Sequence, residues 1–136
     1  MKKQTLIVAS LCLVAGLAIS ANAQTEVKAK VPFSFVVSGK ILPAGDYTMV
    51  ANPHQVKIED ADGNILAMVL ANEVSGHLGQ KGRIIFHCYR DRCFLAEVWP
   101  ASRENGRELL TSRAEAELAK EVNGKYFAVL AEKPTP

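Results

Sequence analysis

The chain has 136 residues, of which 49% are hydrophobic and 22% charged, and its formal net charge at pH 7 is +2. This length suits one domain with a single hydrophobic core, which needs neither a metal nor a dense disulfide framework to fold. The small net charge excludes the basic excess of nucleic-acid-binding proteins and the polybasic runs that bind anionic membranes.

The first 23 residues have the three regions of a secretory signal peptide. Lys2 and Lys3 give a positive start, and residues 6–19 form an uncharged apolar run. Small residues follow, which predicts cleavage between Ala23 and Gln24. The apolar run is shorter than the roughly 20 residues of a membrane span. We therefore expect no stable membrane insertion after cleavage, with an uncleaved anchor as the alternative.

Cleavage would change both the charge and the cysteine content of the chain. Of the 16 basic residues, Lys2 and Lys3 would be lost, which leaves 14 basic and 14 acidic residues. Cys12 would also be lost. It is not expected to be acylated, because the residue before it is a leucine where a lipoprotein signal needs a small residue. We expect residues 24–136 to form one periplasmic or secreted domain with a frayed C-terminal tail.

The sequence after residue 24 predicts mainly β-structure. Residues 31–37 and 46–51 alternate apolar side chains with a period of two, as strands do when one face is buried. An Asp62-Gly63 pair between two alternating runs is a strong hairpin signal. A second hairpin is expected around Arg90-Asp91. The further expected elements are strands 55–60, 65–70, 83–89 and 93–99, and a polar, glycine-rich loop over 73–82.

The periodicity changes near the C-terminus and predicts a helix over about 112–122. Ser112 and Glu115 have the spacing of a capping box. The apolar residues Ala114, Leu118 and Val122 recur every four positions, and Asn123-Gly124 is a helix stop. A last strand is expected over 125–131. The predicted fold is a mainly β antiparallel sandwich or small barrel with one C-terminal helix followed by a final strand.

Several strings of residues resemble a family of small exported bacterial proteins of unknown function. The strings are Val31-Pro32-Phe33-Ser34-Phe35, Leu42-Pro43-Ala44-Gly45-Asp46-Tyr47, Phe94-Leu95-Ala96-Glu97-Val98-Trp99 and Gly106-Arg107-Glu108-Leu109. The resemblance covers nearly all of the chain from residue 31 to the last strand. It implies export and a compact β-rich domain, and it brings no catalytic residues. Cys88 and Cys93 lie outside the pattern.

The two remaining cysteines are predicted to form a disulfide across the second hairpin. A two-residue turn at Arg90-Asp91 places Cys88 opposite Cys93 in a non-hydrogen-bonded pair, where Cα atoms approach to about 4.5 Å. Two alternative roles for the cysteines, a redox-active pair and a metal site, have less support from the sequence. A redox-active pair normally has two intervening residues at a helix N-terminus. A metal site with His87 lacks a fourth ligand, and His87 and Cys88 face opposite sides of a strand.

No recognised catalytic, phosphate-binding or metal-binding motif is present in the sequence, so we expect no cofactor and no metal. Glu97 lies among apolar residues, where a carboxylate is either half-buried with a raised pKa or paired with Arg83 or Arg107. We expect the arginine pair. An extracytoplasmic hydrolase with a site around Glu97 and His87 is the alternative function.

The aromatic residues Tyr89, Phe94 and Trp99 are candidates either for the core or for an exposed patch that binds a partner. Tyr89, Glu97 and Trp99 are therefore the candidate binding residues. The main hypothesis is a non-enzymatic binding or structural domain of the cell envelope, with a protein or a glycan as its partner and without affinity for nucleic acid.

Overall fold

The computed structural model describes residues 25–76, 81–101 and 105–132. The predicted signal peptide and its cleavage site between Ala23 and Gln24 lie outside the described residues, as do residues 77–80 of the predicted loop and the end of the C-terminal tail. The elements in the described part are β1 (Glu26–Val31), β2 (Phe35–Val37), β3 (Lys40–Leu42), β4 (Gly45–Ala51), β5 (Gln55–Glu59), β6 (Ile65–Ser75), β7 (Arg83–Tyr89), β8 (Arg92–Trp99), β9 (Asn105–Leu109), α1 (Arg113–Glu121) and β10 (Lys125–Leu130).

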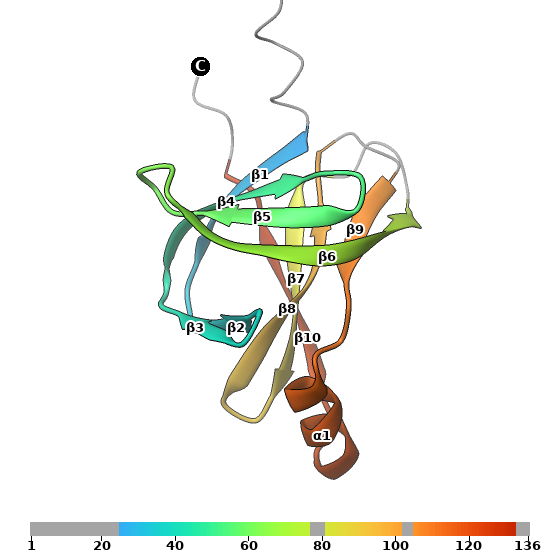
Figure 1. Cartoon of the computed structure of the whole chain (residues 1–136). Helices are drawn as coiled ribbons and strands as arrows, with labels where there is room; N and C mark the ends of the chain where they lie inside the picture. The colour runs from blue at the N-terminus through green and yellow to red at the C-terminus, as the bar shows by residue number, and fades with distance from the viewer. Residues whose placement is uncertain (1–24, 77–80, 102–104, 133–136) are drawn as a thin grey trace, which may run out of the picture.

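These strands form one curled sheet, in which β4, β5 and β6 cross over β7, β8 and β10 (Figure 1). Neighbours run in the order β1-β4-β5-β6-β9-β8-β7-β10, and the short β2–β3 hairpin joins at β8. Every pairing is antiparallel except the single parallel contact of β2 with β8. A backbone hydrogen bond of 2.8 Å from Glu132 N to Lys28 O draws the two outer strands together at one end. The predicted mainly β fold, with one helix before the last strand, is confirmed.

The curl encloses a single core between the two halves of the sheet. Its largest fully buried side chains alternate along the strands, as the two-residue period requires. They are Phe35, Phe86, Met49, Ile58, Ile84, Val27, Val31, Val56 and Val98. In β4, Tyr47, Met49 and Ala51 share one face and point inward. The buried rings of Phe35 and Phe86 pack edge to face with centroids 5.2 Å apart, which is a favourable aromatic geometry.

The expected first strand, residues 31–37, is interrupted in the structure. β1 ends at Val31 and β2 begins at Phe35, with Pro32 between them. Proline has no backbone N–H to donate to a ladder, so a strand ends at this point. Residues 26–31 alternate buried and exposed side chains and pair with β4 over their whole length. Strand β1 was therefore not predicted, apart from its last residue.

The predicted loop over 73–82 begins later than expected, because β6 continues to Ser75. Residues 73–75 pair with β9, a strand that was not predicted. The residues of β9 have few apolar side chains. Its two buried positions are Gly106 and Leu109. Its stability therefore comes from the neighbouring strands β6 and β8, which a local pattern cannot reveal.

Helix α1 agrees with the predicted bounds, with Ser112 as the N-cap residue and Val122 as the C-cap residue. The Ser112 hydroxyl accepts a hydrogen bond of 3.2 Å from the Glu115 backbone N–H, which is one half of a capping box. Of the expected apolar face, Leu118 and Val122 are half-buried, but the first turn of the helix differs from the expectation. Ala114 is exposed and Glu115 is buried, with only 5% of its surface accessible. This buried carboxylate is the starting point for the candidate site.

Candidate functional site

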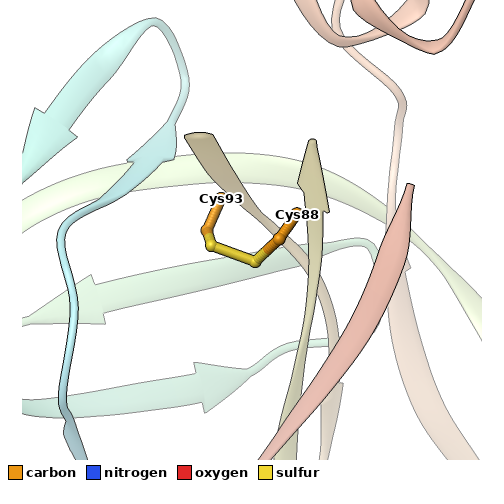
Figure 2. Close-up of a disulfide and its surroundings, with 2 residues drawn as sticks. All are labelled: Cys88 and Cys93. Carbon is orange, nitrogen blue, oxygen red and sulfur yellow. A yellow bond between two sulfur atoms is a disulfide. The ribbon is translucent and has the colours of Figure 1, made fainter. Parts of the chain in front are cut away.

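The tip of the β7–β8 hairpin is closed by a disulfide between Cys88 and Cys93 (Figure 2). The two residues are directly opposite each other in the register, with Cα atoms 4.0 Å apart. Arg90 adopts a positive φ of 57° in the two-residue turn beyond them. The pairing agrees with the expectation from the sequence. The disulfide faces the core side, because Cys88 is buried and its neighbour His87 lies on the other face of β7.

Two side chains on the outer face of this hairpin contact one carboxylate of helix α1. Glu115 Oε2 accepts a hydrogen bond of 2.9 Å from the Tyr89 hydroxyl and lies 3.1 Å from His87 Nδ1. An ionised carboxylate only accepts hydrogen bonds, so His87 donates to it in the tautomer that carries hydrogen on Nδ1. Hydrogen bonds to a charged group are the stronger kind. Glu115 therefore fixes both side chains on β7 and joins α1 to the sheet. We call these three residues the Glu115 cluster.

Burial and the neighbouring carboxylate act together on Tyr89. Loss of water around the ring raises the pKa of Tyr89 to about 12, with further contributions from the hydrogen bond to Glu115 and its negative charge. Both effects disfavour a phenolate beside a carboxylate. Tyr89 is therefore a stable hydrogen-bond donor throughout the neutral range.

Tyr126 at the beginning of β10 and Gly124 just before it pack against the Glu115 cluster. The Tyr126 ring meets the His87 ring edge to face, with centroids 4.5 Å apart. Gly124 lies so close to Tyr89 that a β-carbon there would be 2.6 Å from Cε1 of its ring. Glycine is thus required at position 124 by this close approach. Its φ is not in the left-handed region, and α1 ends instead with Val122 in an extended conformation.

A shallow pocket of about 190 Å³ opens beside these residues. Its lining comes from β7, β10, the last turn of α1 and the turn that follows: His87, Tyr89, Ala119, Val122, Asn123, Gly124, Lys125 and Tyr126. We call it the Tyr126 pocket. Tyr126 is the most exposed aromatic side chain in the described part of the chain, with 75% of its surface accessible. The pocket therefore combines a fixed polar wall with an exposed ring.

Glu97 has a different partner from the predicted one. Its Oε1 accepts a hydrogen bond of 3.2 Å from the Trp99 indole, and among the described residues it forms no ion pair. Arg83 lies over the Trp99 ring at 4.7 Å, and Arg107 donates to the Asn52 carbonyl. The predicted pairing of Glu97 with an arginine is wrong because both arginines have other partners.

The structure does not join Glu97 to His87. The register places both on the outer face, where Glu97 pairs with Ile85 and His87 pairs with Phe94. A bulge between Ile85 and Phe86 adds a residue to β8 at this point. The carboxylate that contacts His87 is Glu115, 28 residues further along the chain. The only local signal for Glu115 was its place in the capping box, which says nothing about its side-chain partner.

Three aromatic residues were candidates either for the core or for an exposed patch, and all three are buried. Tyr89, Phe94 and Trp99 have 8%, 3% and 7% of their surface accessible. Trp99 packs so closely on Gly106 that a β-carbon there would be 2.4 Å from its ring. Of the candidate binding residues, Tyr89 lines the Tyr126 pocket, whereas Glu97 and Trp99 do not. Tyr126 and Lys125 belong to the predicted last strand, but their exposure was not anticipated.

The described ranges contain neither a group of metal-binding side chains nor a membrane-spanning helix. No three His, Cys, Asp or Glu side chains there are grouped so that they could hold a metal ion. No helix in the same ranges is long and apolar enough to cross a membrane. Comparison of the chain with protein-family models, with curated proteins and with solved structures finds no match.

Proposed function

We propose that the chain is exported through a cleaved signal peptide and acts in the cell envelope as a non-enzymatic binding domain. The positive start, the apolar run and the cleavage site between Ala23 and Gln24 support export. The Cys88–Cys93 disulfide also supports it, because disulfides persist in oxidising compartments outside the cytoplasm.

The observation that carries the binding role is the exposed Tyr126 ring beside a wall of fixed side chains. Tyr126 packs on His87, and His87 is held by the buried Glu115 carboxylate. A surface with its side chains already in place loses less conformational entropy when a partner binds. Tyrosine suits such a surface because it offers a large apolar ring and a polar hydroxyl. We assign the partner-binding surface to the Tyr126 pocket.

A hydrolase is the second candidate, and one observation favours it. Glu115 holds His87 through Nδ1, which is how a carboxylate orients a histidine that acts as a general base through Nε2. The carboxylate beside His87 is thus Glu115, whereas the alternative hydrolase site was expected around Glu97 and His87. Turnover of an envelope substrate that is lost in His87→Gln but kept in Tyr126→Ala would favour the hydrolase over the binding domain.

The test of the binding role is affinity capture of the tagged protein from the envelope fraction of the cells that make it. We expect capture of a defined envelope component by the wild-type chain and a large loss with Tyr126→Ala. Leu70→Ala is the matched control, because Leu70 is exposed to 65% and lies in β6, which is not a neighbour of β10. Equal capture by the wild type and Tyr126→Ala would contradict the assignment of the surface.

Intact mass of the captured protein tests the export step separately. Mature protein that begins at Gln24 is the expected result. A full-length chain that stays in the cytoplasm would overturn the envelope role, whatever the domain binds.

A further inference from the structure

We infer that the Tyr126 pocket binds one neutral saccharide unit of an envelope glycan. This inference rests on the proposed binding role and adds the chemical class of the ligand. It is carried by three properties of the pocket, namely its size, its mixture of aromatic and polar groups, and its balance of charge.

The pocket is too small for an extended peptide and too open for a buried cofactor. Its volume of about 190 Å³ is below the roughly 300–1,000 Å³ of sites for drug-sized ligands. Its lining includes the end of α1 and the beginning of β10. The helix lies at the same end of the molecule as the tip of the β7–β8 hairpin (Figure 1). A ligand of one ring matches this size, and the rest of a longer chain would extend into solvent.

The lining residues suit a ligand that has one apolar face and several hydrogen-bonding groups. The Tyr126 ring and the aliphatic Ala119 and Val122 provide apolar surface. Asn123 can both donate and accept hydrogen bonds, and Lys125 can donate them. A pyranose ring has this character, because its C–H groups form an apolar face and its hydroxyl groups surround the rim. Tyrosine side chains suit such mixed ligands.

Charges of both signs lie around the pocket, so neither an anion nor a cation has a clear advantage there. The C-terminal end of α1 borders the pocket and carries the negative end of the helix dipole. The Glu115 carboxylate lies directly behind His87 and Tyr89, so negative charge disfavours an anion. The positive charge of Lys125, which also lines the pocket, disfavours a cation. A neutral polyhydroxyl ligand is repelled neither by the Glu115 carboxylate nor by the Lys125 ammonium group.

The test is titration of the isotope-labelled protein, purified from the exported fraction, followed through its backbone amide NMR signals. The neutral probes are glucose, galactose, mannose and N-acetylglucosamine, and the charged probes are inorganic phosphate and choline. We expect at least one neutral sugar to shift the amide signals of residues 123–126 in a saturable way. Neither charged probe should bind there.

Variants make the result specific to the pocket. Tyr126→Ala should weaken binding by about tenfold, because it removes the stacking surface. Tyr126→Phe keeps the ring and should stay close to the wild type. Phe127→Ala is the matched aromatic control, because Phe127 lies on the other face of β10 against Phe33.

Three results would overturn the inference. They are no sugar binding at residues 123–126, binding of phosphate or choline there instead, or sugar binding that Tyr126→Ala leaves unchanged. If no sugar binds while capture of an envelope component still depends on Tyr126, the ligand class is wrong and the binding role stands. If capture also fails, both proposals fall.

Discussion

The Tyr89 hydroxyl donates a hydrogen bond of 2.9 Å to the Glu115 carboxylate, across 26 residues of sequence. The bond joins the outer face of β7 to the one helix in the described part of the chain. His87 approaches the same carboxylate oxygen at 3.1 Å. One buried charge therefore positions two of the side chains that line the Tyr126 pocket, and the predictions below begin with it.

Glu115→Ala should lower the free energy of unfolding by about 1–3 kcal/mol, because it leaves the Tyr89 hydroxyl and His87 Nδ1 without their acceptor. Glu115→Gln should cost less, since its amide oxygen can still accept hydrogen bonds, although it is uncharged. Denaturant unfolding measures both. Glu117→Ala on the same helix is the control, because its contact with Lys120 is exposed and should contribute no more than about 0.5 kcal/mol. Equal effects of Glu115→Ala and Glu117→Ala would show that the cluster does not stabilise the fold.

The alkaline stability of the protein should depend on Tyr89. Its pKa is about 12 in the folded chain against an ordinary value of 10.0, so the unfolded state loses its proton first. This contribution to stability is complete below pH 10 and is lost as the pH rises to about 12. Burial also raises the pKa of Tyr47, so the wild type alone cannot isolate Tyr89.

Comparison of Tyr89→Phe with the wild type isolates the effect of Tyr89. The free energy of unfolding, measured by denaturant at a series of pH values from 9 to 12, should fall less steeply in the variant. Parallel curves would show that the pKa of Tyr89 is not raised by the fold.

Gly124→Ala should destabilise the protein by about 1–3 kcal/mol, because it overpacks the space beside the buried Tyr89 ring. The added β-carbon would lie 2.6 Å from the Tyr89 ring, which must move and weaken its bond to Glu115. Thermal unfolding measures the loss. At Gly45, a β-carbon would meet only Tyr47 at an ordinary 3.9 Å, so Gly45→Ala serves as the control and should be neutral. A stable Gly124→Ala protein would contradict the close packing of Tyr89.

The disulfide should be present in protein from the exported fraction but should add little stability. Cys88 and Cys93 are five residues apart, and so short a loop restricts the unfolded chain less than a 15-residue loop, which is worth about 3 kcal/mol. Alkylation and intact mass should find no free thiol before reduction. Two free thiols would contradict the pairing. Unchanged partner capture by the double variant Cys88→Ala/Cys93→Ala would exclude a redox role.

Features with a local cause could be predicted from the sequence. The Asp62-Gly63 turn follows from residues that favour it, since the Asp60 carboxylate accepts bonds from the N–H groups of residues 62 and 64 and Gly63 takes a φ of 85°. The hairpin that pairs Cys88 with Cys93 and the bounds of α1 are of the same kind. Strand β9 was missed because its stability depends on neighbours distant in sequence.

The Glu115 cluster could not be predicted, because its contacts cross 26 and 28 residues. The helical periodicity favoured Ala114 as the inward position, and a carboxylate at the next residue is normally solvated. Only the tertiary structure shows that Glu115 is buried with two partners. For the same reason the sequence could not distinguish Tyr126, which is exposed, from Tyr89, which is buried.

The most direct test of the proposed binding role is site-specific photo-crosslinking in the living cells that produce the protein. A photoreactive amino acid would replace Tyr126 in one variant and Leu70 in another. The binding role predicts a crosslink from position 126 to an envelope component, in mature protein that begins at Gln24, and no such crosslink from position 70. Crosslinks to cytoplasmic components, or the same products from both positions, would contradict it.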